Sequence, residues 1–319
     1  MQRGPYFKLG KMEIFTAFEQ LNGMPVAATI GSFDGVHRGH VAMIAEARSL
    51  AKKRGLPLVV VTFARHPRLL FSGCNMPFLL SSNDEKIALI EKAGADAVML
   101  LPFDNGMASF CARDFMHTVL SSRMNVRMLA VGYDHHFGRP CSGEGIEEYK
   151  KYGCEAGIEV IQMTPYEAGG VLVSSSKVRG ALAAGDMSQV SEMLGRYYSI
   201  DGSVVHGAAL GRRLGFPTAN ISLSEPLKLL PLDGVYECNI HVATNCYKGV
   251  MNIGCKPTIN SGERTIEVFI IDFEGDIYNE RVKVDVVRRL RGERRFAGLD
   301  DLRSQIMLDV QEVKNINNK

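Results

Sequence analysis

Apolar and polar positions follow one rhythm in the first half of the chain. Short apolar runs alternate with stretches of helical spacing, at residues 26–30, 41–54, 58–63, 84–93, 97–101, 112–121 and 128–132. Strands that alternate with helices in this way are typical of an α/β domain, a parallel sheet with helices on both faces. In open sheets of this class, ligands bind beyond the carboxyl ends of the strands. The loops that follow the apolar runs are therefore the first places to search for chemistry.

The rhythm changes after Tyr197. Short runs now follow one another, with Gly, Asp and Asn between them, at residues 198–206, 235–242, 247–253, 265–273 and 282–290. This pattern predicts an antiparallel β-barrel. A short helix is expected at 187–194 before the barrel, and a terminal helix at 299–310 after it. We expect two domains, at residues 1–184 and 185–319.

The composition is that of an ordinary globular protein, with 46% hydrophobic and 23% charged residues. A net charge of +2 gives no argument for nucleic-acid binding. Residues 1–11 contain no apolar signal segment, and no apolar run reaches the roughly 20 residues of a membrane span. The seven cysteines form no CxxC pair, which argues against a zinc site or disulfide framework and favours the cytoplasm. Five arginines between residues 288 and 295 are either a solvated face or a functional cluster.

The most informative loop follows the apolar run at 26–30 and reads GSFDGVHRGH, residues 31–40. If a helix begins near His37, the spacing of His37 and His40 puts both rings on one face of its first turn. Helix N-terminal amides and two imidazoles together form an anion site that suits a triphosphate. Gly31 and Gly39 allow a phosphate to approach the backbone closely. The alternative is a pair of histidines in an ordinary glycine-rich loop.

This loop resembles the signature of the HxGH nucleotidyltransferases. The form with Phe33-Asp34-Gly35 before the first histidine is similar to the bifunctional riboflavin kinase/FMN adenylyltransferases, the prokaryotic-type FAD synthetases. The resemblance implies a Rossmann-like first domain that transfers AMP from ATP to FMN, giving FAD and pyrophosphate. His37 and His40 would then stabilise charge on the α-phosphate, and Gly31, Phe33 and Gly39 would contact ATP.

Three further loops resemble sequence motifs of the same family. His66 and Pro67 match an element that helps to hold the flavin, although Arg65 stands where the family has proline. Asp134 matches a polar position near the reacting groups, with His135 in place of a phenylalanine.

The third phrase contains Ser175, Ser176 and Arg179, which by resemblance grip the ATP phosphates, the arginine reaching the departing pyrophosphate. Simpler interpretations stay open for these loops. His66 could be an ordinary surface histidine, and serines before a helix are plain N-caps.

The second half contains its own signature, residues 207–220, which end in Pro-Thr-Ala-Asn. Glycines four apart could form a flexible hairpin, but the full phrase resembles that of riboflavin kinases. By resemblance, Gly207, Gly211 and Gly215 cover the ATP phosphates, while Thr218 and Asn220 are ligands of Mg²⁺, which prefers oxygen donors. No Walker-type loop is present in the sequence.

A carboxylate for proton transfer is expected on the apolar run that contains Glu267. On a strand, Glu267 shares a face with Phe269 and Ile271, where a charge is costly without partners or a task. By resemblance it takes the proton of the ribityl 5′-hydroxyl; an exposed position on an edge is the alternative. Arg291 and Phe296 would lie near the flavin, with Asp309 of the last helix nearby, and Lys256 replaces a family arginine.

We therefore expect a bifunctional enzyme of the cytoplasm. Its second domain makes FMN from riboflavin and ATP, its first domain makes FAD from FMN and ATP, and Mg²⁺ is the cofactor. Riboflavin, FMN, FAD and ATP are the expected partners, with neither nucleic acid nor membrane, and the oligomeric state stays open. Two alternatives are a riboflavin kinase with an impaired adenylyltransferase domain and a non-catalytic flavin sensor.

Overall fold

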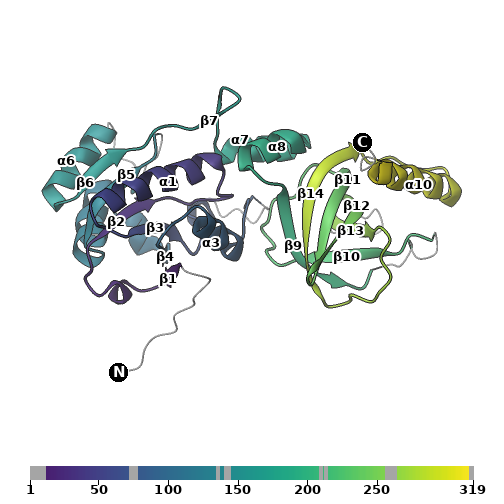
Figure 1. The fold of residues 1–319 in the computed structure, drawn as a ribbon, viewed down its shortest axis with the longest axis horizontal. Coiled ribbons are helices and arrows are strands. Elements are labelled where there is room, and N and C mark those ends of the chain that lie inside the picture. The colour runs from purple at the N-terminus through teal and green to yellow at the C-terminus, as the bar shows by residue number, and fades with distance from the viewer. Residues whose placement is uncertain are drawn as a thin grey trace. The chain divides into compact units, whose positions relative to one another are not determined.

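The computed structural model describes residues 12–71, 78–133, 137–139, 145–207, 211, 215–255 and 264–315. The chain forms two compact units (Figure 1). The first contains Met1–Met76 and Ser81–Ser174, and the second contains Pro77–Leu80 and Ser175–Lys319. Residues 77–80 join the second unit because the backbone amides of Phe78 and Leu79 both donate to the Leu227 carbonyl, at 2.9 Å. The domain border at 184/185 stays a prediction.

A parallel sheet of six strands forms the centre of the first unit. The strands are β1 (Glu13–Phe15), β2 (Val26–Ile30), β3 (Leu58–Phe63), β4 (Ala97–Leu101), β5 (Val126–Val131) and β6 (Glu159–Gln162). Their spatial order is β1-β4-β3-β2-β5-β6. The chain thus builds outward from β2 in both directions, and the loops after β2 and β5 lie at the switch point where ligands bind in such sheets.

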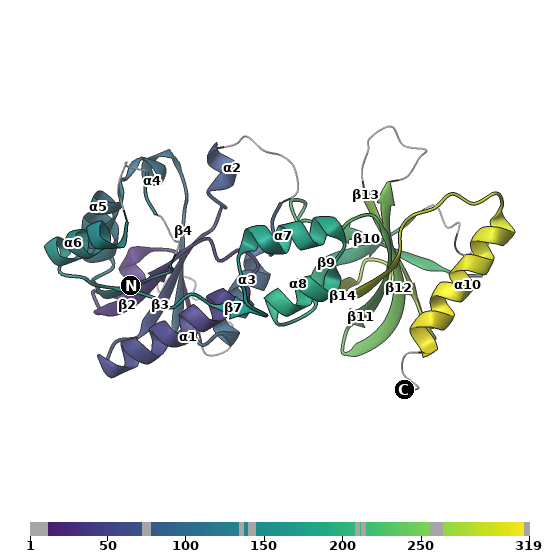
Figure 2. The same ribbon diagram turned by 90° about the horizontal axis from the view of Figure 1, so that it is seen from above.

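Helices cover both faces of this sheet (Figure 2). The helices of this unit are η1 (Phe18–Leu21), α1 (Arg38–Lys53), α2 (Arg68–Phe71), α3 (Asn83–Lys92), α4 (Asn105–Ser109), α5 (Ala112–Phe115), η2 (Met116–Arg123) and α6 (Ile146–Ala156). Ile44 of α1 and Ile90 of α3 pack on one face of the sheet, whereas Leu120 of η2 and Tyr149 of α6 pack on the other. A short hairpin, β7 (Glu167–Ala168) and β8 (Val171–Leu172), completes the unit.

The second unit is a closed barrel with helices at its two chain ends. Its elements are α7 (Ser175–Ala184), α8 (Met187–Leu194), β9 (Tyr198–Val205), β10 (Thr218–Leu223), β11 (Gly234–Val242), β12 (Asn245–Cys255), β13 (Arg264–Ile270), β14 (Arg281–Arg291) and α10 (Leu299–Asn315). The order around the barrel is β10-β13-β12-β11-β14-β9, with antiparallel neighbours. Both predicted fold classes are thereby confirmed.

Alternate residues of each barrel strand fill the interior. On β9, for example, Tyr198, Ile200, Gly202 and Val204 are buried, while the residues between them are partly exposed. The outer face of the barrel is apolar where α10 covers it, because Val313 packs with Val235 and Val250. Outward side chains of β10, β12 and β13 line a cavity together with residues of this helix.

Candidate active sites

The histidine turn of the first unit joins β2 to α1. His37 is the N-cap of α1, and its Nδ1 accepts a hydrogen bond from the His40 amide at 3.3 Å. The two imidazoles stack with ring centroids 3.7 Å apart and an interplanar angle of 15°. His37 is buried and His40 is half-buried. Paired rings at the positive end of a helix form a place where a phosphate group can be held.

The backbone of this turn adopts costly conformations. Phe33 has a φ of 48° and Val36 a φ of 35°, a region that non-glycine residues rarely adopt and that is commonly found at functional sites. The Phe33 ring is buried and contacts His40 edge-on at 5.1 Å. Gly31 donates its amide to the Val61 carbonyl, and a Cβ on Gly39 would lie 3.1 Å from the His37 ring.

The buried carboxylate of Asp34 stabilises the turn through hydrogen bonds to Ser81. This carboxylate, 2% exposed, accepts hydrogen bonds from the Ser81 amide at 3.0 Å and the Ser81 hydroxyl at 3.3 Å. The Ser81 oxygen in turn accepts from the Gly35 amide at 2.9 Å. Sequence reasoning missed the structural part that Asp34 plays, because its partner lies 47 residues away.

The other predicted loops of this unit follow neighbouring strands. His66 and Pro67 come after β3, and the His66 Nδ1 accepts a hydrogen bond from the Arg68 amide at the start of α2. Gly132 and Tyr133 follow β5, and the Tyr133 side chain is 61% exposed. Asp134 and His135 lie outside the described residues. The flavin-binding roles of these loops stay predictions.

The predicted phosphate loop belongs to the second unit. Helix α7 begins at Ser175, so Ser175 and Ser176 lie inside its first turn and not before it as expected. Within the same unit, the Arg179 Nε donates to the Phe78 carbonyl at 2.9 Å. The roles of these three residues in binding ATP stay predictions.

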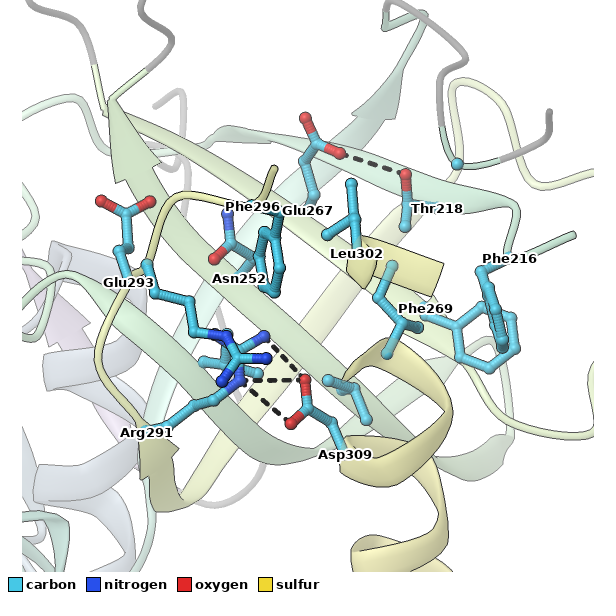
Figure 3. A pocket seen from close by; sticks show the side chains of 15 residues that line it. Phe216, Thr218, Asn252, Glu267, Phe269, Arg291, Glu293, Phe296, Leu302 and Asp309 are labelled. Carbon is cyan, nitrogen blue, oxygen red and sulfur yellow. Dashed lines mark hydrogen bonds and ion pairs between the residues drawn. The ribbon is translucent and has the colours of Figure 1, made fainter. Parts of the chain in front are cut away.

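A cavity of about 320 Å³ lies against the outer face of the barrel, between its strands and α10 (Figure 3). Thr218 and Glu267 lie at one side of this cavity, and Arg291 and Asp309 at another. Phe216, Phe269, Phe296 and Leu302 give it an apolar lining. Apolar walls with a few polar groups are typical of a small-molecule site.

The polar corner of the cavity is built by strand register. The Thr218 hydroxyl donates to the Glu267 Oε2 at 3.2 Å. Asn220 of β10 and Asn252 of β12 are both paired directly with Glu267 of β13, so all three side chains point to the same side of the sheet. Asn252 was not among the predicted site residues, and only the register between distant strands reveals it.

Two glycines of the predicted loop are required by close packing. A Cβ on Gly207 would collide with the Asn220 side chain, and one on Gly211 would collide with the Phe216 carbonyl. Gly211 also lines the cavity, while Gly215 has a φ of 85°. Residues 208–210 and 212–214, and Lys256, lie outside the described residues.

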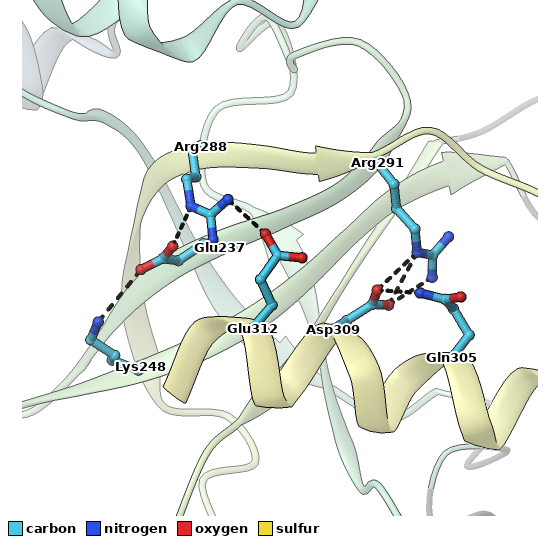
Figure 4. Close-up of polar contacts among 7 residues, drawn as sticks. All are labelled: Glu237, Lys248, Arg288, Arg291, Gln305, Asp309 and Glu312. Atoms are coloured by element: carbon cyan, nitrogen blue, oxygen red, sulfur yellow. Dashed lines mark hydrogen bonds and ion pairs between the residues drawn. The ribbon is translucent and has the colours of Figure 1, made fainter. Parts of the chain in front are cut away.

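Two clusters of charge hold α10 on the barrel (Figure 4). Arg291 of β14 binds the Asp309 carboxylate through Nε at 3.0 Å and Nη2 at 2.8 Å, and the Gln305 amide donates to the same carboxylate. Asp309 is only 4% exposed. Arg291 therefore fixes the helix that forms one wall of the cavity.

The second cluster lies one helical turn further along α10. The Arg288 guanidinium donates to Glu237 and to Glu312, both at 2.8 Å, and Lys248 lies 3.5 Å from the other Glu237 oxygen. Arg288 and Arg291 thus bind carboxylates within their own unit, which excludes a purely solvated arginine face. Phe296 lies beneath the Arg294 guanidinium, with 4.7 Å between the guanidinium carbon and the ring centroid.

A second cavity of about 250 Å³ shares Thr218 with the first. Pro217, Ile270, Phe273 and Tyr278 are among its lining residues. Thr218 consequently lines two spaces, each large enough to hold part of a ligand.

Family models match both halves of the chain. A model described as FAD synthetase matches residues 20–177, and one described as riboflavin kinase matches residues 194–317. The bifunctional riboflavin kinase/FMN adenylyltransferase of Pseudomonas fluorescens is 39% identical over 285 residues, covering 89% of this chain and 90% of that protein. The chain belongs to this bifunctional family. Its counterpart in Escherichia coli (strain K12) is 36% identical and covers 88% and 89% of the two chains.

A solved structure shares the family's architecture. It is described as a macrolide-efflux protein from Streptococcus pneumoniae and matches with a TM-score of 0.85 and 30% identity, over 96% of this chain and 99% of that one. In the described part of the present chain, every helix is too short or too polar to cross a membrane.

Proposed function

We propose that this chain makes FMN and then FAD in two separate sites. The barrel unit phosphorylates riboflavin with ATP, and the unit with the parallel sheet joins FMN to AMP from a second ATP. The observation that carries this proposal is the polar corner at the cavity, where Thr218 and Asn220 of the kinase signature lie beside Glu267. Membership of the family supplies the two activities.

In the kinase step, Glu267 accepts the proton of the ribityl 5′-hydroxyl while that oxygen attacks the γ-phosphorus of ATP, and ADP leaves. The aromatic and aliphatic lining of the 320 Å³ cavity suits the flavin ring. The second cavity, which shares Thr218 with the first, is assigned to the nucleotide. Thr218 then stands where the two substrates meet.

The donor set of this corner fits Mg²⁺. A hydroxyl, an amide and a carboxylate, from Thr218, Asn220 and Glu267, are all hard oxygen donors. Thr218 and Asn220 would hold the ion, with substrate phosphate and water as its other ligands. Bound there, Mg²⁺ would neutralise charge on the transferred phosphoryl group. Glu267 keeps its separate task of accepting the proton.

In the adenylyl step, an FMN phosphate oxygen attacks the α-phosphorus of ATP and pyrophosphate leaves. His37 and His40 stabilise the charge that develops on the α-phosphate, with the α1 amides contributing. Gly31, Phe33 and Gly39 shape the approach to ATP, and Ser175, Ser176 and Arg179 hold its phosphates. His66, Pro67 and Asp134 hold the flavin in this site. Arg291 and Phe296 do so in the kinase site, where Gly207, Gly211 and Gly215 cover ATP.

The cytoplasm is the proposed location. Cys111, Cys154, Cys238 and Cys246 are thiols in the structure, which suits a reducing compartment.

One assay tests the whole proposal. The purified protein is incubated with riboflavin, ATP and Mg²⁺, and riboflavin, FMN and FAD are separated over time. We expect FMN to appear first and FAD to follow. FMN without FAD would favour an impaired adenylyl site, in which Arg65 and His135 are costly departures. Binding of flavin without either product would favour a flavin sensor and overturn the proposal.

A further inference from the structure

A lysine is buried beside the histidine turn of the first unit. Lys86, in the first half of α3, is only 7% exposed, and its ammonium donates to the Phe63 carbonyl at 2.9 Å. Phe63 is the last residue of β3, from which the loop with His66 and Pro67 departs. Buried charges are costly unless they are paired or have a task. The motif-based prediction of the adenylyl site gives Lys86 no part.

Lys86 belongs to a short segment that joins two loops of the adenylyl site. At its start, Ser81 binds Asp34 and Gly35 of the histidine turn. Two residues later, the Asn83 side-chain amide donates to the Ala64 carbonyl at 2.7 Å. Lys86 then binds the neighbouring Phe63 carbonyl. The segment therefore fixes the loop after β2 and the loop after β3 at the same edge of the sheet.

The pKa of Lys86 shows that burial destabilises its charged form. Burial lowers the pKa of Lys86 to about 8, and the negative charge of Asp34 opposes that shift. In the described part of the chain, Asp34 is the charged side chain whose field acts on Lys86. On the same helix, the Glu85 carboxylate accepts the Ser82 amide. An apolar side chain of similar length would avoid the cost of burial but would lose both the donor and the charge.

We propose that Lys86 is a positioning residue of the adenylyl site, whose charged ammonium holds the end of β3 against the buried Asp34 of the histidine turn. It acts by keeping the His66 loop and the His37–His40 turn at the separation that suits FMN and ATP together. Misplacement by about 1 Å can cost about a hundredfold in rate. The inference rests on the proposed adenylylation of FMN.

The test compares three variants of the full chain. Lys86→Met removes the charge with little change of volume, and Lys86→Arg keeps it at every accessible pH. Lys92→Met makes the same substitution at an exposed position of the same helix. FAD formation from supplied FMN is measured as kcat and KM from pH 7 to 9. Riboflavin phosphorylation reports that the barrel unit of each protein is intact, and limited proteolysis reports whether the first unit is folded.

We expect Lys86→Met to lower the kcat of FAD formation by about ten-fold or more at pH 7. Lys92→Met should match the wild type, and FMN formation should be unchanged in all variants. The ratio of wild-type to Lys86→Arg activity should fall as pH rises through about 8, because only the wild type loses its charge there.

Several results would overturn the inference. The first is a Lys86→Met protein with wild-type kcat and pH profile. If limited proteolysis shows that the first unit of Lys86→Met is unfolded, the Lys86→Arg variant provides the test instead. A ratio of wild-type to Lys86→Arg activity that does not change with pH would then reject the proposal. A wild-type protein that makes no FAD at all would instead overturn the proposed function together with the inference.

Discussion

The Thr218 hydroxyl donates a hydrogen bond to the Glu267 carboxylate at 3.2 Å, across the pairing of β10 and β13. The two residues lie 49 positions apart in sequence, and Thr218 faces both cavities of the barrel unit. The contact orients the carboxylate toward the space where a flavin hydroxyl and a nucleotide phosphate would meet. In the proposed role of base, a carboxylate held in this way would need no rearrangement before it accepts a proton.

The first prediction concerns Glu267→Gln. The amide keeps the shape of the side chain but cannot act as a base, so we expect riboflavin phosphorylation to fall by about 10² to 10⁴-fold. FAD formation from supplied FMN should continue, because it takes place in the other unit. Chromatographic separation of the three flavins measures both rates in one sample. Equal loss of both activities in a folded protein would contradict the assignment of two sites.

The converse prediction concerns His40→Ala. Removing the half-buried partner of the His37–His40 stack should reduce FAD formation by about 10² to 10³-fold, comparable to loss of one donor in an oxyanion hole. FMN formation should stay at the wild-type rate. Because the His40 amide remains, the hydrogen bond to His37 that starts α1 is kept. Thermal unfolding should therefore change little, and a large fall in melting temperature would point to a structural role instead.

A third prediction tests the attachment of α10. Arg291→Met leaves the Asp309 carboxylate buried without its main partner, which should cost about 3–5 kcal/mol of stability. The KM for riboflavin should rise, because α10 contributes Asp309 and Leu302 to the cavity wall. Urea unfolding and kinase kinetics measure the two effects.

The matched control for Arg291→Met is Lys314→Gln on the same helix. It breaks the Lys314–Asp272 pair, whose side chains are 47% and 76% exposed. An exposed pair of this kind contributes about 0–1 kcal/mol, so the control should behave as the wild type. Adding Asp309→Leu to Arg291→Met should recover part of the stability, because a buried charge is then removed. No recovery would mean that the pair does more than neutralise that charge.

The bounds of a secondary-structure element could be predicted from the sequence where burial alone determines the pattern of apolar residues. Strands β2, β3 and β4 have the predicted bounds because every position of a central parallel strand is buried or nearly so, which gives a continuous apolar run. Strand β10 was missed, since Pro217-Thr218-Ala219-Asn220 resembles a loop and becomes a strand only through its partners β9 and β13. Helix α6 was also missed. Its Gly153 lowers helix propensity, yet a Cβ there would collide with Val160 of β6.

The same limit applies to the sites. His37 and His40, or Thr218 and Asn220, are close in sequence, so their spacing alone indicates a shared face. Asn252, the Arg291–Asp309 pair and Lys86 depend on contacts between segments that are distant along the chain. Local patterns contain no information on such register and packing. These residues could therefore be assigned only from the folded structure.

The last prediction follows from the lowered pKa of Lys86. In the unfolded chain this lysine titrates near 10.5, and in the folded chain near 8. Below pH 8 both states are protonated and the cost of burying the charge is fully present. Between pH 8 and 10.5 the folded state has released its proton while the unfolded state retains it, so stability rises with pH. The gain should approach about 3 kcal/mol.

Urea unfolding of the full chain at several pH values between 7 and 10.5 tests this prediction. Other groups titrate in the same range, so the informative quantity is the difference between the wild type and Lys86→Met. The variant should be the more stable protein at pH 7, and its advantage should shrink as pH rises. Lys92→Met should show neither effect, because Lys92 is exposed. A constant difference across the range would mean that Lys86 binds its proton equally in the folded and unfolded chains, so that folding does not lower its pKa and the burial of its charge carries no such cost.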